Sequence, residues 1–360
     1  MSQLKLTDVA KINMGQSPSS ETYNSEKNGL PFYQGNVDFG EKYPTVRIWC
    51  DKPTKIAEPG DILMSVRAPI GALNYANEKC CIGRGLAAIT PDPDMTSSEF
   101  IYWFLRARHS ELNRIGTGST FKAINRKTLE SIEFPKYNKN EQYYIAEILS
   151  KIDKTIGEKK AQLEKLDNLI KARFVEMFGD KDFEKKPFKD VCEELFAGGD
   201  VKRDRTVKDA DSNHSYPVFT NGEKDGGLYG YTDVARVTKP SITISGRGTI
   251  GFCLVRAEPF YPAIRLIVAI PKENLVTPSY LKYFIDSKDY SGRGASIPQL
   301  TIPMIKDEPV PIPLIKIQKE FESIVTQVDK SKFALSNELA MGNFYIRLIY
   351  DCIMHSCIDL

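Results

Sequence analysis

The chain has 360 residues, of which 41% are hydrophobic, and a formal net charge of +2. This length allows two or three ordinary domains, and the balance of charges excludes a globally basic protein, so any binding of nucleic acid must come from local clusters of charge. No run of 18 apolar residues occurs and the N-terminus lacks an apolar core. We therefore expect neither a membrane span nor a secretory signal, and a cytoplasmic location. The seven cysteines show no CxxC pairing, which predicts free thiols.

Residues 1–140 mix short strand-like runs with turns, which predicts a mixed α/β domain of the α+β class. The runs at 61–66 and 81–90 are typical of strands that glycines interrupt. Residues 98–112 have the spacing of an amphipathic helix, with Ser98 as its predicted N-cap. A turn rich in Gly, Ser and Thr follows at 116–120.

Residues 141–180 have a different character and predict a long spacer helix. Apolar residues recur at seven-residue steps and at the complementary position, which is the pattern of a coiled-coil seam. The predicted seam comprises Ile145, Leu149, Ile152, Ile156, Leu163, Leu166, Ile170 and Met177, with interruptions at Lys159 and Arg173. A long core helix of an ordinary bundle is the alternative.

Residues 181–315 repeat the first domain at an offset of about 180 residues, which is too long for a solenoid unit and suggests two copies of a whole domain. The segment EPGDILMSVRAPIGALNYA at 58–76 corresponds to KPSITISGRGTIGFCLVRA at 239–257. Within this pair of segments Gly71 is matched to Gly251, at an offset of 180 residues. Residues 280–289 correspond to the helix predicted from Ser98.

A second spacer helix is expected in residues 316–360, with Phe321, Val325, Val328, Leu335 and Leu339 along its seam. This helix is predicted to be shorter than the first. The apolar, Cys-containing residues after Leu339 have no counterpart in the first half, so we expect an atypical tail and incomplete pairing of the two helices.

Two motifs that suggest other chemistry are weak. Gly246–Gly251 match GxGxxG, but a dinucleotide-binding fingerprint needs a following helix, whereas residues 252–255 resemble a strand. This pattern favours a glycine-rich hairpin. Cys352, His355 and Cys357 lack a fourth ligand at a usual spacing, so no metal site is expected. We find no catalytic constellation and expect no enzymatic activity.

Polar and cationic residues in loops are the remaining candidates for a binding site. Arg and Asn or Gln can contact base edges through two hydrogen bonds, whereas Lys, Ser and Thr more often hold phosphates. The candidates are Arg67, Arg84, Ser119, Thr120, Lys122, Asn125, Arg126 and Lys127 in the first copy, and Lys202, Arg203, Arg205, Arg236, Arg247, Arg265, Arg293 and Gln299 in the second.

Taken in order, these features resemble the specificity subunit of a type I DNA restriction–modification system. The resemblance rests on the two diverged halves and on the segments EPGDILMSVRAPIG at 58–71, GTGSTFKAINRKTLESIEFP at 116–135, EQYYIAEILSKID at 141–153 and LIKARFVEMFGD at 169–180. It implies two target recognition domains, each followed by a long helix, with the two helices paired antiparallel as a coiled coil. It also implies a subunit without a cofactor that reads a bipartite site on double-stranded DNA.

The same resemblance implies that catalysis belongs to partners. Two methyltransferase subunits, which use S-adenosylmethionine, and restriction subunits, which use ATP, would assemble on this chain. The predicted helix from Ile145 to Met177 would extend roughly 50 Å, against roughly 34–36 Å for one turn of DNA. Two alternatives stay open: a coiled-coil protein scaffold without DNA binding, and a nucleotide-binding enzyme that uses Gly246–Gly251.

Overall fold

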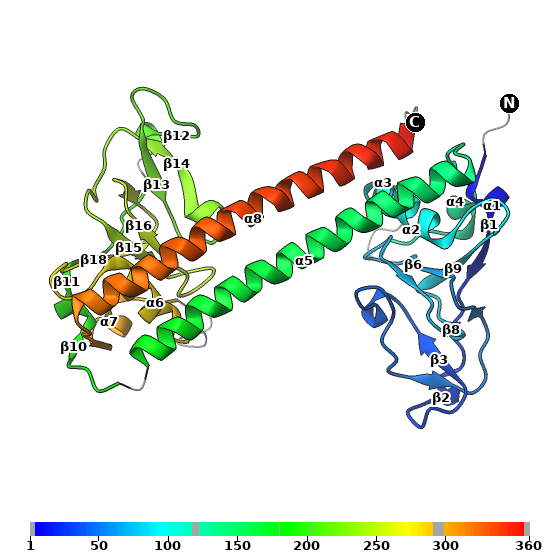
Figure 1. Ribbon diagram of the computed structural model, residues 1–360, viewed down its shortest axis with the longest axis horizontal. Helices are drawn as coiled ribbons and strands as arrows, with labels where there is room; N and C mark the ends of the chain where they lie inside the picture. The colour runs from blue at the N-terminus through cyan, green and yellow to red at the C-terminus, as the bar shows by residue number, and fades with distance from the viewer. Residues whose placement is uncertain (1–3, 117–121, 180, 202, 291–298, 356–360) are drawn as a thin grey trace. The chain divides into compact units, whose positions relative to one another are not determined.

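In a computed structural model, residues 4–116, 122–179, 181–201, 203–290 and 299–355 are described. The chain divides into two compact units (Figure 1). Unit 1 comprises residues 1–161 and 336–360, and unit 2 comprises residues 162–335. Each unit therefore combines one α/β domain with one stretch of each long helix.

The described residues of unit 1 form two sheets. The four-stranded antiparallel sheet has the order β1 (Ala10–Met14), β9 (Leu86–Pro91), β6 (Ile62–Ser65) and β7 (Leu73–Tyr75). The five-stranded sheet has the order β2 (Tyr23–Asn24), β4 (Trp49–Cys50), β3 (Leu30–Tyr33), β8 (Cys80–Ile82) and β5 (Ile56–Ala57). The short helices of unit 1 are α1 (Leu6–Val9), α3 (His109–Ile115), α4 (Arg126–Glu130), η1 (Ser20–Thr22) and η2 (Asn36–Asp38).

The sequence of strand β6 is almost entirely apolar because both faces of the strand are buried. Successive side chains of a strand point to opposite faces. Ile62 and Met64 enter the core beneath α2 (Ser98–Ala107), whereas Leu63 enters a separate core that also contains Tyr33 and Ile82. Both faces are covered, so the usual alternation of apolar and polar residues is absent. The strands predicted at 61–66 and 81–90 are confirmed, the second as β8 and β9.

Unit 2 repeats this plan. One antiparallel sheet has the order β11 (Cys192–Ala197), β18 (Ile267–Pro271), β15 (Ser241–Ile244) and β16 (Cys253–Arg256), and a second has the order β12 (Thr206–Val207), β14 (Leu228–Thr232), β13 (Tyr216–Phe219) and β17 (Tyr261–Pro262). A two-stranded sheet pairs β10 (Lys185–Pro187) with β19 (Pro309–Pro311). The helices are α6 (Pro278–Asp286), α7 (Ile302–Ile305), η3 (Phe188–Val191), η4 (Arg203–Arg205) and η5 (Lys224–Gly227).

The two units also have corresponding backbone hydrogen bonds at equivalent positions. The amide of Ser65 donates to Ala72 at 2.8 Å, and the amide of Ser245 donates to Phe252 at 2.9 Å. Gly71 and Gly251 have φ angles of 84° and 82°, the left-handed region that favours glycine. The predicted correspondence of these two glycines is thus confirmed, together with the mixed α/β class of both domains.

The predicted helix at 98–112 needs correction at both ends. Ser97, not Ser98, is the N-cap, because its side chain accepts a hydrogen bond from the amide of Phe100. The helix ends at Ala107, and α3 begins at His109 as a separate helix. In unit 2 the cap is Thr277, which accepts from the amide of Tyr280, so α6 begins and ends a few residues earlier than the predicted 280–289.

Two long helices contribute to both units. Helix α5 runs from Lys139 to Phe178 over 40 residues, and α8 runs from Ile315 to His355 over 41 residues. The prediction of a shorter second helix with an atypical tail is therefore wrong. The tail continues α8, and Ile346 and Ile353 are buried in the core of unit 1.

The helices pair antiparallel, since the start of α5 packs against the end of α8 in unit 1, and the end of α5 packs against the start of α8 in unit 2. Ion pairs flank the apolar contacts, with Lys159 and Glu338 at 2.7 Å in unit 1 and Lys332 and Asp167 at 2.6 Å in unit 2. Of the predicted seam residues, Ile145, Leu149, Ile156, Ile170, Phe321, Val325 and Val328 are buried, and Ile152, Leu163, Leu166, Met177, Leu335 and Leu339 are half-buried.

A buried glutamine near the start of each long helix ties it to its domain. Gln318 donates to the carbonyls of Leu275 and Pro313 at 2.9 and 2.8 Å and accepts from the amide of Thr277 at 2.8 Å. Gln142 donates to the carbonyls of Met95 and Tyr137 in the same way. These bonds satisfy backbone groups that burial would otherwise leave unpaired.

Candidate functional site

The glycine-rich segment Gly246–Gly251 lies in the connection between two paired strands. Ile244 of β15 is opposite Cys253 of β16, in antiparallel register. No helix follows the glycines, so the geometry of a dinucleotide-binding strand–turn–helix is absent from this segment. The predicted hairpin is confirmed.

Several loops of unit 2 converge at the end of its first sheet, next to this hairpin. The amide of Leu300 donates to Gly246 at 2.8 Å, and the amide of Gly198 donates to Leu266 at 2.8 Å. Asn221 links two further loops, because its Oδ1 accepts from the amide of Gly246 at 2.7 Å while its Nδ2 donates to the carbonyl of Ile264 at 2.5 Å. Segments distant in sequence thereby form one surface.

This surface contains a groove of about 240 Å³ in which Arg247, Arg265 and Gln299 are the long polar side chains. Arg247 donates to Oε1 of Gln299 at 3.3 Å. All three residues are exposed. No carboxylate occurs among the described residues that line the groove, so its cationic charge is not neutralised locally. Such a surface suits a partner that carries hydrogen-bond acceptors and negative charge.

Unit 1 has the same backbone arrangement at the corresponding place. The amide of Ile124 donates to Val66 at 2.9 Å, as that of Leu300 does to Gly246, and Gly83 donates to Tyr33 at 2.8 Å, as Ala263 does to Phe219 at 2.9 Å. These bonds bring the loops that contain Arg67, Arg84 and Lys122 to one edge of the domain. All three side chains are exposed.

Three other candidate residues have contacts within their own domain that give each side chain a structural role. Asn125 is the N-cap of α4, since its Oδ1 accepts from the amide of Thr128 at 3.0 Å. Arg126 pairs with Glu130 at 2.7 Å. The guanidinium of Arg236 stacks over the ring of Phe196 at 4.2 Å. Ser119, Thr120, Lys202 and Arg293 lie outside the described residues.

Asn221 is the residue of this surface that the sequence prediction omitted. It lies in a Thr-Asn-Gly turn after β13, where Asn and Gly are common in any loop. Only its two hydrogen bonds to separate loops distinguish it from an ordinary turn residue. The feature of the sequence that could have identified Asn221 is its position two residues after the end of strand β13.

Five of the described cysteines are buried and unreactive. Cys50, Cys80, Cys81, Cys192 and Cys253 are buried as free thiols. Burial raises the pKa of the Cys80 and Cys192 thiols to about 12, which keeps them protonated at neutral pH. No cluster of three or more metal-ligating side chains occurs among the described residues. Cys357 and the side chain of His355 lie outside them.

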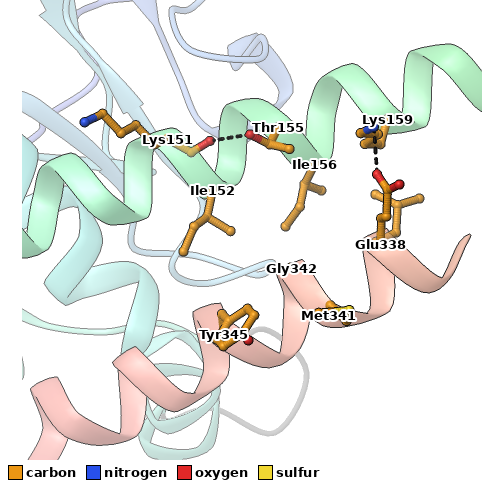
Figure 2. Close-up of a pocket in the computed structure, with 10 residues that line it drawn as sticks. Lys151, Ile152, Thr155, Ile156, Lys159, Glu338, Met341, Gly342 and Tyr345 are labelled. Atoms are coloured by element: carbon orange, nitrogen blue, oxygen red, sulfur yellow. Dashed lines mark hydrogen bonds and ion pairs between the residues drawn. The ribbon is translucent and has the colours of Figure 1, made fainter. Parts of the chain in front are cut away.

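A second hollow lies on the paired helices of unit 1. Figure 2 shows Ile152 and Ile156 of α5 directed toward Gly342 of α8, with Met341 and Tyr345 beside it. The groove measures about 310 Å³. A side chain at Gly342 would meet Ile156, because a Cβ built there lies 3.0 Å from its Cγ1 atom.

Apolar side chains are exposed beside this groove. Met341, Phe344, Tyr345 and Leu348 of α8 are 48–62% exposed. An exposed apolar patch of this kind is typical of an interaction surface. Over the described residues no helix has the length and apolar composition needed to cross a membrane.

Comparison with known proteins now decides the family. The model of the type I restriction modification DNA specificity domain matches the chain twice, over residues 1–168 and 180–340. The chain belongs to this family. The resemblance drawn from the sequence is thus confirmed, and DNA recognition is the function that the family name describes.

Individual relatives agree with this assignment. The MjaIX type I restriction enzyme specificity subunit of Methanocaldococcus jannaschii is 25% identical over 370 residues, covering 89% of this chain and 85% of the relative. A provisionally named MjaX specificity subunit of the same organism is 42% identical over 161 residues, but the match spans only 38% of its length and 45% of this chain. The crystal structure of a type I restriction-modification S subunit from M. genitalium matches with a TM-score of 0.63 at 18% identity, covering 97% of this chain and 94% of that one. At this identity the likeness concerns the fold alone.

Proposed function

We propose that this chain is the DNA-recognition subunit of a type I restriction–modification complex and reads a bipartite site, with one domain for each half. The proposal is carried by the repeated backbone scaffold, which presents exposed arginines on loops at the corresponding edge of both units. Arginine is the side chain most suited to guanine edges and phosphates. Two linked readers of half-sites also bind more tightly than either alone.

We further propose that the chain performs no reaction and holds no cofactor itself. Methyltransferase subunits would supply S-adenosylmethionine chemistry on a base that has left the duplex, and restriction subunits would use ATP. The patch formed by Met341, Phe344, Tyr345 and Leu348 supports docking of a methyltransferase subunit on the helices of unit 1. Its apolar character suits a stable protein partner better than DNA.

The test is DNA binding by the chain together with its methyltransferase partner. A selection from random duplexes should return a split sequence with an unspecified gap, and binding should weaken with salt. Replacing residues 181–315 with those of a relative should change one half of the sequence and leave the other half intact. A protein scaffold without DNA binding would show the partner complex but no selected sequence, and that result would refute the proposal.

Docking is tested separately by Phe344→Asp and by Tyr143→Asp, a matched control on α5 that is also exposed. Phe344→Asp should reduce co-purification of the methyltransferase at least tenfold, since an unpaired charge would have to be buried in the interface. Loss of the partner with both variants, or with neither, would contradict the proposed docking patch.

A further inference from the structure

Two consecutive residues of unit 2 adopt a backbone conformation that L side chains rarely take. Ile264 and Arg265 have φ angles of 52° and 58°. Non-glycine residues in this left-handed region are strained, and such strain occurs preferentially at functional sites. The turn lies directly before β18 and borders the groove that contains Arg247 and Gln299.

Three hydrogen bonds from neighbouring loops and one within the turn hold it in place. The amide of Ile264 donates to Gly199 at 2.7 Å, and the amide of Arg265 donates to Gly198 at 3.0 Å. Leu266 donates to Ala263 at 3.1 Å, and Asn221 donates to the carbonyl of Ile264. The surrounding structure thus stabilises a backbone conformation that is unfavourable for Ile264 and Arg265 by themselves.

The strained turn places Arg265 in the lining of the groove, and this feature is particular to unit 2. The corresponding residues of unit 1 are Arg84 and Gly85, and neither has a positive φ. No ion pair or hydrogen bond of the Arg265 guanidinium is found within the described part of the chain. Arg247, in contrast, is oriented by Gln299.

We propose that Arg265 determines base specificity by contacting a guanine in the half-site read by unit 2, with Arg247, oriented by Gln299, as its neighbour in the same groove. This inference rests on the proposed function. The guanidinium presents parallel N–H donors that match the O6 and N7 acceptors of guanine in the major groove. An arginine whose guanidinium is bonded to none of the described residues and whose backbone is fixed can make such a contact with little rearrangement of the chain.

Phosphate binding is the competing role for an exposed arginine, and the two roles predict different outcomes. A phosphate contact adds affinity for every sequence and steepens the salt dependence. A guanine contact adds affinity only for sequences that carry this base. Lysine retains the charge but loses the planar pair of donors, so Arg265→Lys separates the two roles.

The experiment uses the complete complex of this chain with its methyltransferase partner and a library of duplexes randomised over both half-sites. Wild type, Arg265→Ala, Arg265→Lys and Arg84→Ala are compared by the sequences that they select, and thermal melting checks that each variant is folded. Both Arg265 variants should lose preference for guanine at one position of one half-site, by about 5- to 150-fold for Arg265→Ala. The other half-site should be unchanged.

Arg84→Ala should leave that guanine preference intact. Equal weakening on all sequences, with Arg265→Lys close to wild type, would assign Arg265 to a phosphate and overturn the proposal, as would an unchanged selected sequence in both Arg265 variants. If wild type itself selected no sequence, the proposed function would fail, which is a different result from a wild-type motif that is insensitive to Arg265.

Discussion

Replacing Ile353 with alanine tests whether the end of α8 is part of the core of unit 1. The side chain of Ile353 is 1% exposed and belongs to the same apolar cluster as Ile145 and Leu149 of α5. Truncation of a buried isoleucine to alanine costs about 2–5 kcal/mol. Because Ile353 lies near the end of its helix, where neighbours can move inward, we expect about 2–3 kcal/mol.

The two tryptophans of the chain provide the assay. Trp49 and Trp103 both belong to unit 1, and Nε1 of Trp103 donates to Ser150 of α5 at 3.0 Å. Tryptophan fluorescence in urea therefore follows this unit alone. With a slope of about 2 kcal/mol/M, Ile353→Ala should lower the midpoint by about 1–1.5 M.

The control is Leu348→Ala on the same helix, where the side chain is 50% exposed. It removes similar atoms from a surface position and should change stability by about 0.5 kcal/mol or less. Equal midpoints for the Ile353 and Leu348 variants would refute the reasoning, because the tail would then contribute nothing to the core of unit 1.

Three further predictions concern both units. Gly157→Ala should stabilise α5 by about 0.5–1 kcal/mol in thermal melts followed by circular dichroism, since beyond the adjoining helix backbone no atom lies within 4 Å of its Cβ position. Gly342→Ala, whose Cβ would crowd Ile156, should stabilise the protein less, and a larger gain at Gly342 would contradict this reasoning. Gln318→Ala should cost about 2–3 kcal/mol because it leaves buried backbone groups unpaired, measured as faster amide exchange at the start of α8. The raised pKa of Cys80 and Cys192 predicts that both thiols resist a disulfide reagent at pH 8 until denaturant is added; rapid labelling of the folded protein would be inconsistent with this.

Periodicity and duplication made much of the fold predictable. The long helix, the glycine-rich hairpin and the correspondence of Gly71 with Gly251 follow from spacing alone. The tail of α8 was predicted wrongly because residues after Leu339 do not resemble the first half. Its seam spacing nevertheless continues through Ile346 to Ile353, and a glycine at the intervening seam position, Gly342, obscured the pattern.

The candidate site was less accessible to sequence reasoning. Arg247 and Gln299 were identified as loop residues, but their hydrogen bond joins positions about fifty residues apart, and such contacts depend on tertiary packing rather than on local propensity. The left-handed turn at Ile264 and Arg265 carries neither glycine nor asparagine, the residues by which such a conformation is usually anticipated. Its conformation depends on two other loops, which contain Gly198–Gly199 and Asn221.

The division of the chain into units has a consequence for synthesis on the ribosome. Unit 2 is one uninterrupted segment, whereas unit 1 needs residues from both sides of that segment. Domains fold as their residues emerge, so the later-encoded module can reach its native state while the earlier one still lacks the strip of α8 around Ile346. The apolar cluster of the earlier module therefore stays incomplete until translation has passed the later one. Holdase chaperones would have their longest opportunity to bind the earlier module in that interval.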